Sequence, residues 1–218
     1  MCVHLMMKAG STCDQAIQIA FSPYNLMLRV IAGKFRGRLL KSVPGDTTRP
    51  VTDRVKEALF NILANNVVDS SWWDVFGGTG AIGIEAISRG AKFVRFCDLN
   101  RLPVETIKEN LATLGCAGQA QVLRGDAFAL LAAEPTYQFD YIYIAPPQYK
   151  QMWIKGVELV DAHPRWLSDD GELIVQIHPV EYAELELKNF EKVEERKYGS
   201  TLLVFYNKKE TTPKQQGA

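Results

Sequence analysis

The stretch that most constrains the fold of this chain lies between Trp72 and Ile87. An apolar run at 72–76 leads directly into Gly77-Gly78-Thr79-Gly80, and residues 81–87 continue as a helix-forming segment. This order predicts a strand, a tight turn and a helix. Glycine is needed there because such a turn visits positive φ and lets a ligand approach the backbone, while the helix N-terminus offers unpaired N–H groups. An ordinary strand-to-helix turn without a ligand is the alternative.

Two further observations favour a ligand. Gly78, Gly80 and Gly83 match the spacing G-x-G-x-x-G of dinucleotide-binding turns. The next predicted strand, 93–97, is followed by Asp98, where an acidic side chain can accept hydrogen bonds from two ribose hydroxyls. Asp98 as a helix N-cap is the competing interpretation. The pattern predicts a nucleotide-type ligand and leaves its identity open.

Charge is distributed unevenly along the chain. The 218 residues carry a formal net charge of zero, so no overall attraction draws the protein to nucleic acid or membrane. Between positions 29 and 54, however, basic residues outnumber the acids Asp46 and Asp53; they are Arg29, Lys34, Arg36, Arg38, Lys41, Arg49 and Arg54. This predicts a polyanion-binding face, with a solvated charged loop as the alternative.

Cysteine and histidine usage excludes several classes of site. None of the 4 cysteines forms a C-x-x-C pair and the chain has only 3 histidines, so the sequence predicts no metal site and no disulfide framework. A reducing, cytoplasmic location is expected. His163 and His178 have no partner pattern and are interpreted as structural. No apolar run reaches the ~18 residues of a membrane helix.

The N-terminal part divides into two segments. Residues 1–26 lack the pattern of a signal peptide, and we expect a mobile leader or an upstream extension, with Met27 as a candidate start. Residues 27–66 predict a basic β-hairpin, with 28–32 and 37–41 as its strands, and a helix from Asp53 capped by Thr52 or Asp53. Phe35 between Lys34 and Arg36 in the hairpin turn could stack on a base.

Strands and helices alternate through residues 67–208, which predicts an α/β fold with a doubly wound, mostly parallel seven-stranded sheet. Gly199-Ser200 separates the last two strands, which should pair as an antiparallel hairpin; this ending is typical of S-adenosylmethionine (SAM) methyltransferases rather than dehydrogenases. Residues 209–218 predict a disordered tail. The expected strands are 72–76, 93–97, 120–124, 139–144, 171–178, 192–198 and 201–207, and the expected helices are 80–89, 101–114, 126–133, 151–163 and 180–188.

Two more strand ends carry chemistry. Asp126 follows the third strand of this series and can accept a hydrogen bond from an adenine amine, cap the next helix, or do both. The fourth strand, 139–144, ends in Ala145-Pro146-Pro147-Gln148-Tyr149. Its two prolines fix the backbone at the carboxyl edge of the sheet, where doubly wound folds bind ligands. A simple loop terminator is the alternative.

Taken together, these residues resemble the amino-methyltransferases that act on nucleic-acid bases. Upstream, Arg29-Val-Ile-Ala-Gly-Lys-Phe-Arg-Gly-Arg-Leu39 and Arg49-Pro-Val-Thr-Asp-Arg-Val-Lys-Glu-Ala-Leu-Phe-Asn61 resemble the RsmD family, bacterial guanine-N2 methyltransferases of 16S ribosomal RNA. The resemblance covers about 28–207. It implies SAM as cofactor and, as partner, 16S ribosomal RNA or the assembling small ribosomal subunit. We expect a monomer that uses neither a membrane nor a metal.

The resemblance also implies residue roles. The backbone of 76–80 would hold the methionine part of SAM, Asp98 the ribose hydroxyls and Asp126 the adenine amine. The implied cofactor-binding residues are Asp74, Phe76, Gly77, Gly78, Thr79, Gly80, Asp98, Leu99, Asp126 and Ala127. The implied RNA contacts are Arg29, Lys34, Arg36, Arg38, Arg49 and Arg54.

One departure affects the catalytic segment, which comprises Ala145, Pro146, Pro147, Gln148 and Tyr149. The family pattern has Asp or Asn before Pro-Pro and an aromatic directly after, whereas this chain has Ala145 and inserts Gln148 before Tyr149. Three outcomes are open. Gln148 supplies the missing oxygen while Tyr149 or Tyr143 stacks on the base, the carbonyl of Ala145 suffices for a slower enzyme, or the protein binds SAM and RNA without methylating.

Other functions compete with this prediction. An NAD(P)-dependent oxidoreductase would explain the glycines and Asp98, but not Pro146-Pro147 or the terminal hairpin. A non-catalytic RNA-binding or ribosome-assembly factor is supported by Ala145 alone. Methylation of adenine or of DNA is a further possibility, against which the two upstream motifs argue.

Overall fold

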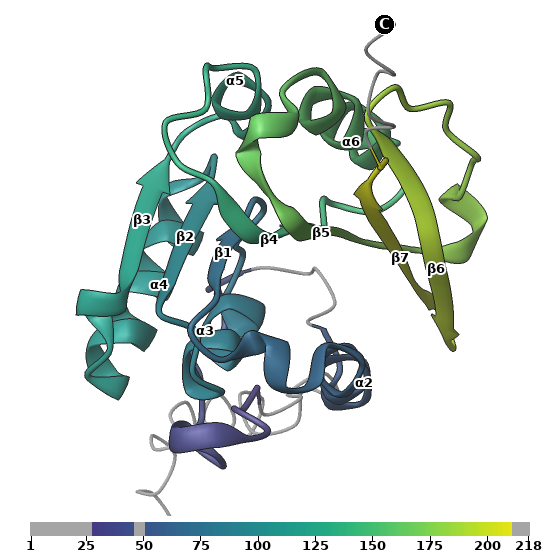
Figure 1. The fold of residues 1–218 in the computed structure, drawn as a ribbon. Helices are drawn as coiled ribbons and strands as arrows, with labels where there is room; N and C mark the ends of the chain where they lie inside the picture. Colours follow the sequence, from purple (N-terminus) through teal and green to yellow (C-terminus); the bar gives the residue numbers. More distant parts are fainter. Residues whose placement is uncertain (1–27, 46–50, 211–218) are drawn as a thin grey trace, which may run out of the picture.

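A single sheet of seven strands organises the protein, in the order β3-β2-β1-β4-β5-β7-β6 (Figure 1). The computed structural model describes residues 28–45 and 51–210. β1 to β5 run parallel, and β7 lies antiparallel between β5 and β6. The strands are β1 (Ser71–Asp74), β2 (Phe93–Asp98), β3 (Ala120–Arg124), β4 (Phe139–Ile144), β5 (Leu167–Ile177), β6 (Phe190–Tyr198) and β7 (Thr201–Lys208).

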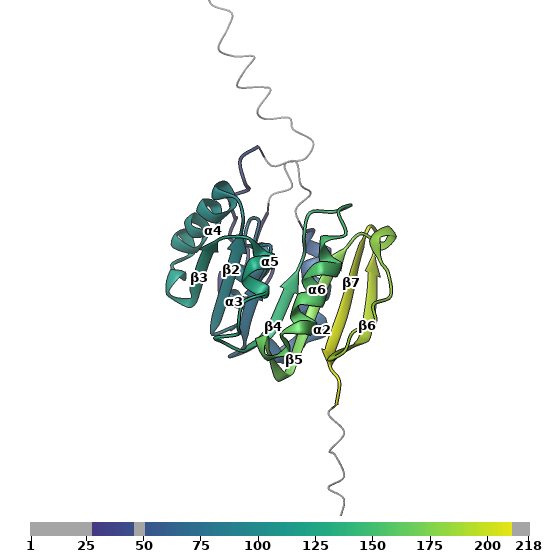
Figure 2. The ribbon, with the colours of Figure 1, turned by 90° about the horizontal axis from the view of Figure 1, so that it is seen from above.

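Helices cover both faces of the sheet (Figures 1 and 2). One face carries α2 (Asp53–Leu63), α3 (Ala81–Ser88) and α4 (Arg101–Leu114), and the other carries α5 (Ala127–Leu131) and α6 (Met152–Ala162). Short 3₁₀ turns connect them: η1 (Gly33–Phe35), η2 (Ala64–Val67), η3 (Ala117–Gln119), η4 (Pro164–Trp166) and η5 (Pro179–Glu181). This architecture confirms the predicted doubly wound fold with its antiparallel ending.

The alternation of side chains along each strand divides the core into two layers. Trp72 packs with the layer under α2, α3 and α4, whereas Trp73 packs with the layer under α5 and α6. Phe96 and Cys97 of β2 divide in the same way. Successive strand residues point to opposite faces, so an unbroken apolar strand supplies both layers at once.

The order in which the strands are added reverses between β1 and β4. β2 and β3 lie on one side of β1, and the later strands lie on the other. The carboxyl ends of these parallel strands open at one edge, and doubly wound sheets bind ligands at such a switch point. The loops after β1 and β4 are therefore the two that border the expected ligand.

The predicted N-terminal hairpin is present, but with less strand pairing than expected. Only one bridge, Arg29 to Leu39, is formed, flanked by hydrogen bonds from Val30 N–H to the Arg38 carbonyl and from Gly37 N–H to the Val30 carbonyl, each 2.9 Å. The expected turn is the 3₁₀ segment η1. Leu28, Val30 and Leu40 belong to the same buried cluster as α2 and α3, so this segment is part of the main core; they alternate with the exposed Arg29 and Leu39.

The prediction of a helix over 180–188 is wrong. After η5 the chain runs without helix to β6. Leu185 and Leu187 pack on the core two positions apart, which is the spacing of extended chain rather than of a helix. The Asp161 carboxylate of α6 accepts the N–H groups of Lys188 and Asn189 at 2.9 and 2.7 Å, and so satisfies backbone that a helix would otherwise satisfy.

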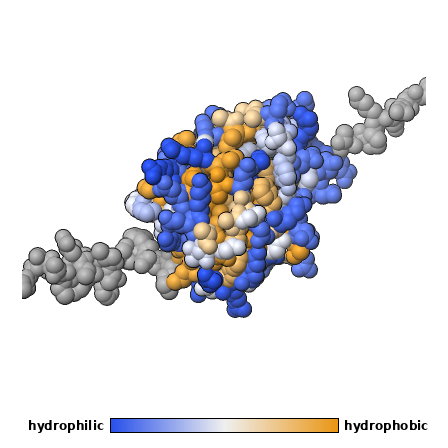
Figure 3. Space-filling view, turned by 90° about the vertical axis from the view of Figure 1, so that its left-hand side faces the viewer, coloured by the Kyte–Doolittle hydropathy of each residue, from blue (hydrophilic) through white to orange (hydrophobic). Residues whose placement is uncertain are grey.

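Smaller differences concern element ends and surfaces. β1 ends at Asp74 instead of 76, and β5 begins at Leu167 instead of 171. Within the part of the chain described, no helix has the length and apolarity to cross a bilayer. The side of the molecule on the left in Figure 1 carries a band of apolar surface between polar side chains (Figure 3). The expected leader 1–26, Met27, Arg49 and most of the tail lie outside the described residues.

Candidate active site

The turn between β1 and α3 is closed by backbone hydrogen bonds, one within the turn and one to the end of β2. Gly77 N–H donates to the Cys97 carbonyl and Gly80 N–H to the Gly77 carbonyl, both at 2.7 Å. Gly78 and Gly80 have φ values of +52° and +78°. These values lie in the left-handed region, which glycine adopts without the steric cost of a Cβ. The expected glycine turn is therefore present as a defined loop at the end of β1.

Two glycines of the motif, Gly83 and Gly78, have different physical roles. A Cβ on Gly83 would lie 2.3 Å from Cε1 of Phe96, so only glycine lets α3 pack this closely on β2. A Cβ on Gly78 would meet nothing nearer than the Phe76 carbonyl oxygen at 4.0 Å. The turn is thus packed where it faces the sheet and open at Gly78, where a ligand can approach.

Three acidic residues stand at or just beyond the carboxyl ends of adjacent strands. Asp74 ends β1, Asp98 ends β2, and Asp126 follows β3 by two residues. The Asp98 carboxylate accepts Gly78 N–H at 3.1 Å and Asn100 N–H at 2.9 Å, which ties it to the glycine turn. Asp126 is exposed and caps α5 by accepting Phe128 N–H at 2.8 Å, the helix-cap role that the sequence left open.

Asp74 differs from the other two acids because it is buried, with 2% exposure. Burial raises the pKa of Asp74 to about 8, an effect opposed by its hydrogen bond from Gly83 N–H and reinforced by the charge of Asp98. The site therefore stores a proton near neutral pH beside the start of α3. If a bound cation displaced this proton, Asp74 would present an ionised carboxylate at the end of β1.

These residues fit SAM as a cofactor. The open glycine turn gives backbone room for the amino-acid part, the partly exposed Asp98 can accept ribose hydroxyls, and the exposed Asp126 can accept an amine. Phe76 packs against Phe128 with ring centroids 5.9 Å apart, which forms an apolar wall between the β1 and β3 ends. Thr79 is half-buried in the turn, Leu99 is exposed, and Ala127 is buried as the first residue of α5.

The loop after β4 has a different character. Ala145 is half-buried and Pro146 is buried, whereas Pro147, Gln148 and Tyr149 are exposed. Tyr149 has φ +63° and its N–H donates to Glu181 Oε1 at 2.7 Å. Its ring is 68% exposed and lies 5.5 Å from the ring of His178. The predicted aromatic residue therefore stands at the surface of the site.

Tyr143 is not available to stack on a base, which corrects that part of the sequence interpretation. It is 1% exposed, next to the last residue of β4, and its hydroxyl donates to Gln176 at 2.5 Å. Burial raises the pKa of this phenol well above its usual value, with a further contribution from Asp74. Tyr149 is the aromatic side chain left for stacking in this loop.

Comparison with known proteins identifies the family. The model of the family described as "Conserved hypothetical protein 95" matches residues 28–207. This chain belongs to that family. Membership of the RsmD group, expected from the two upstream motifs, is confirmed.

Its relatives include named methyltransferases. "Putative rRNA methyltransferase YlbH" of Bacillus subtilis is 38% identical over 84% of this chain and 100% of the relative. "Ribosomal RNA small subunit methyltransferase D" of Escherichia coli K12 is 36% identical over 68% of this chain and 74% of the relative. A solved structure, "Putative methyltransferase yhhF from Escherichia coli", superposes with a TM-score of 0.75 at 31% identity, covering 84% of this chain and 98% of the other.

The basic residues upstream of the family's methyltransferase sheet fall into two groups. Four of them have partners within the protein: Arg29 pairs with Asp53 and Lys41 with Glu109, each at 2.9 Å, while Lys34 donates to Gln119 at 2.7 Å and Arg38 to the Thr113 carbonyl at 3.1 Å. Arg36 and Arg54 are exposed, and within 28–45 and 51–210 the side chain of neither has a hydrogen bond or ion pair. Those two are the most available for a polyanion.

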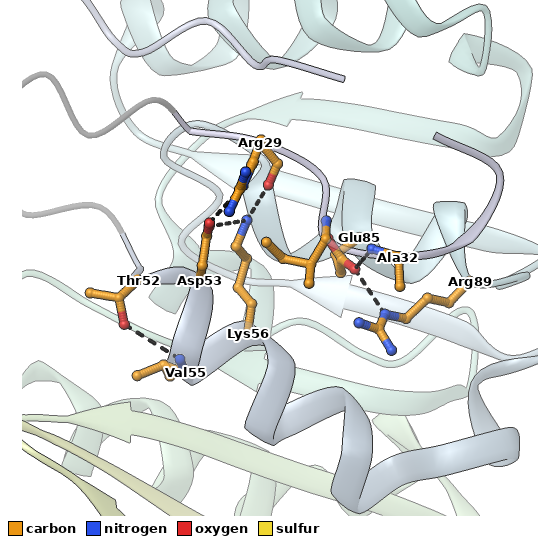
Figure 4. A network of polar contacts seen from close by, with 9 residues as sticks. Arg29, Ala32, Thr52, Asp53, Val55, Lys56, Glu85 and Arg89 are labelled. Atoms are coloured by element: carbon orange, nitrogen blue, oxygen red, sulfur yellow. Dashed lines mark hydrogen bonds and ion pairs between the residues drawn. The ribbon is translucent and has the colours of Figure 1, made fainter. Parts of the chain in front are cut away.

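A buried polar network, which the sequence analysis did not anticipate, fixes the basic segment to the sheet (Figure 4). Glu85 of α3 is fully buried and accepts the N–H groups of Ile31 and Ala32 at 2.8 and 2.9 Å, together with Arg89 Nε at 2.8 Å. Lys56 of α2 is also fully buried; it donates to the Arg29 carbonyl and lies 3.6 Å from Asp53.

Each of the two buried charges has an ionic partner: Arg89 for Glu85 and Asp53 for Lys56. Burial lowers the pKa of Lys56, while Glu85 and Asp53 raise it. Removing Arg89 would leave the buried Glu85 without its ion-pair partner, and removing Asp53 would do the same to the buried Lys56; loss of one partner of a buried pair is strongly destabilising. The signal in the sequence was Glu85 itself, an acid inside the otherwise apolar run Ala81–Ile87.

Asn110 links the basic segment to the glycine turn. It is 2% exposed on α4, accepts Lys41 N–H at 2.8 Å, and donates to the carbonyls of Lys41 and Thr79, each at 3.1 Å. One buried amide thus touches both the predicted RNA-binding segment and the predicted cofactor turn. A buried Asn on the apolar face of a predicted helix is the only sequence sign of it.

Proposed function

We propose that this protein is a SAM-dependent methyltransferase that modifies the exocyclic N2 amine of a guanine in 16S ribosomal RNA, as free RNA or in the assembling small subunit. The observation that carries the proposal is the open glycine turn beside the acidic ends of β1, β2 and β3. Relatives named as ribosomal RNA methyltransferases support the substrate class. The SAM sulfonium, when bound, supplies an electrophilic methyl group.

The chain's own task is to orient the amine. A guanine amine is a weak nucleophile because its lone pair is delocalised into the ring, so acceptors for its N–H groups must turn the lone pair toward the methyl carbon. Ala145 offers only its carbonyl, and the exposed Gln148 offers an amide oxygen three residues later. We assign these two oxygens to the amine and assign the exposed Tyr149 ring to stacking on the base.

RNA binding is assigned to the basic segment. Arg36 and Arg54 can contact phosphates, while Arg29, Lys34 and Arg38 reach the RNA only by sharing or exchanging their internal partners. Phosphate contacts position a nucleic acid without reading its sequence. The network of Glu85 and Lys56 would hold this segment still while the base enters the site. Arg49 remains an expected contact from outside the described residues.

The alternative is a SAM- and RNA-binding factor without activity, which Ala145 favours. The deciding experiment measures methyl transfer from labelled SAM to small ribosomal subunits that lack the modification, with wild type and Ala145→Asp side by side. Restoring an oriented acceptor should raise the rate on the order of 10²-fold, by analogy with removal of an oxyanion-hole donor. Nuclease digestion and mass spectrometry would identify the methylated position.

Each result has a clear meaning. Incorporation at the N2 amine of one guanine by the wild type supports the proposal and shows that Ala145 is tolerated. Incorporation only by Ala145→Asp, with SAM bound by both proteins, supports the non-catalytic alternative. Wild-type activity unaffected by Gln148→Ala would remove Gln148 from the mechanism and leave the Ala145 carbonyl. Binding of NAD in place of SAM would overturn both.

A further inference from the structure

We propose that Glu181 is a positioning residue that holds the loop 145–151 in the conformation used for methyl transfer. This inference rests on the proposed function, and it concerns a residue outside every motif considered so far. Glu181 ends η5, just after β5, and therefore lies on a different element from the loop after β4. Its carboxylate and its backbone carbonyl both reach across to that loop and to α6.

The loop 145–151 needs an external anchor. Tyr149 and Gln151 have φ values of +63° and +52°, and neither is glycine. A side chain in the left-handed region costs about 1 kcal/mol or more, and it persists only where surrounding structure enforces it. Residues 147–150 are exposed, so packing alone does not supply that enforcement.

Glu181 supplies this anchor at two points. Its Oε1 accepts Tyr149 N–H at 2.7 Å, and its backbone carbonyl accepts Nε1 of Trp153 at 3.3 Å. Trp153 is fully buried in the first turn of α6, so one end of the connection is rigid. Among the described residues, no other side chain hydrogen-bonds to the turn 147–150.

The anchor at Glu181 also affects the orientation of the Tyr149 ring. Because its N–H is held by Glu181, the ring rests beside His178, with 5.5 Å between centroids. His178 and Glu181 belong to the same connection after β5. The Tyr149 ring, to which we assign base stacking, is thus oriented from that connection rather than from its own loop.

The second oxygen of the Glu181 carboxylate also bears on its role. Glu181 Oε2 is buried and has no hydrogen-bond partner among the described residues. A buried acceptor without a partner is unfavourable, which a residue chosen only for stability would avoid. What the loop requires is the Oε1 acceptor, and glutamine can offer the same acceptor through its amide oxygen. This distinguishes a hydrogen-bonding role from a role of the negative charge.

The test compares Glu181→Ala with Glu181→Gln, and uses Glu184→Ala as the matched control. Glu184 lies on the same segment, exposed, and pairs with Lys192 at 3.0 Å without touching the loop. We expect Glu181→Ala to lower kcat for subunit methylation about 10- to 100-fold with the SAM Kd within twofold. Glu181→Gln should stay within about threefold of the wild type, and Glu184→Ala should match it.

A second readout does not depend on activity. Lys150 is exposed in the anchored turn, so trypsin should cut after Lys150 several-fold faster in Glu181→Ala than in wild type or Glu181→Gln, as followed by mass spectrometry. Thermal unfolding of each variant checks that the fold is intact. If the wild type does not methylate, the proposed function fails, and cleavage at Lys150 together with the same variants in an Ala145→Asp background still decides the role of Glu181.

Three results would overturn the inference. The first is unchanged kcat in Glu181→Ala with an active wild type. The second is equal cleavage at Lys150 in all variants. The third is a Glu181→Gln protein as slow as Glu181→Ala, because the charge rather than the hydrogen bond would then be the required feature.

Discussion

Two loops meet at the carboxyl edge of the sheet, and they are built in opposite ways. The turn 76–80 after β1 is closed by backbone hydrogen bonds and has glycine at both of its left-handed positions. The loop 145–151 after β4 is exposed from Pro147 onward, has Tyr149 and Gln151 at its left-handed positions, and is held through Glu181. Both loops have contacts with distant residues, but the first has glycine wherever its backbone is left-handed, whereas the second has no such glycine and depends on the side chain of Glu181.

The difference matches the two tasks that we assign. A cofactor turn binds a nucleotide-type ligand in many doubly wound folds, and glycines at fixed spacing recur in it. A substrate loop must suit one nucleotide, and its side chains are free to change as long as another element holds it in place. We therefore expect a departure from the family pattern at Ala145 to be less damaging than one at Gly80.

The largest expected effect comes from Gly83→Ala. The new Cβ would lie 2.3 Å from Cε1 of the fully buried Phe96, and relief would require moving α3 away from β2. We expect the free energy of unfolding to fall by about 3 kcal/mol, the upper end for overpacked cores. Urea denaturation measures it. A loss below 0.5 kcal/mol would show that the close packing is not what the third glycine provides.

Gly78→Ala is the matched control for that change. Its Cβ has room, and the left-handed φ costs only about 1 kcal/mol. We expect a folded protein whose SAM affinity falls about tenfold or more, because the methyl group occupies the open side of the turn. Calorimetric titration with SAM would measure the loss. Unchanged affinity would place the cofactor elsewhere.

Asp74→Asn should change the pH dependence of stability. The pKa of Asp74 is raised to about 8 in the fold from an ordinary value of 3.8, so the folded state holds a proton that the unfolded state releases. The stability that this group contributes is complete at low pH and is lost as pH rises toward 8. Asparagine mimics the protonated acid, so the variant should gain on the wild type by up to about 1.4 kcal/mol per pH unit within this window.

Urea unfolding of both proteins at pH 5.5, 6.5, 7.5 and 8.5 provides the measurement. The difference between them should grow with pH and level off above about 8. A constant difference would mean that Asp74 is ionised throughout. The same variant should weaken SAM binding at pH 8 if the ionised carboxylate receives a cationic group of the cofactor.

Tyr149→Ala tests the second loop. We expect kcat for subunit methylation to fall about tenfold, since base–aromatic stacking is worth about 1–3 kcal/mol. SAM affinity should not change, because the ring lies on the loop after β4. Tyr149→Phe serves as the control and should retain activity. Loss of SAM binding in Tyr149→Ala would contradict the division of labour between the two loops.

How much of this could be predicted follows the same division. The strands, the glycine turn and the acids at strand ends are local patterns, and apart from small shifts in strand ends the structure places them as the sequence indicates. The anchors are contacts between distant residues: Glu85 with Ile31, Asn110 with Thr79, and Glu181 with Tyr149. No periodicity encodes them. The helix predicted over 180–188 failed for this reason, because its backbone is satisfied by Asp161 of α6.

The smallest expected effect is that of Gln151→Gly. It places glycine at a left-handed position of the second loop, as Gly78 and Gly80 are placed in the first. Glycine relieves the left-handed φ of +52°, worth about 1 kcal/mol, but it adds freedom to the unfolded chain at a cost of about 0.4–1 kcal/mol. The free energy of unfolding should therefore stay within about 0.5 kcal/mol of wild type. Urea denaturation at pH 6.5 measures it. A large stabilisation would show that the loop is strained beyond what the Glu181 anchor offsets, and a large loss would give the Gln151 side chain a contact of its own.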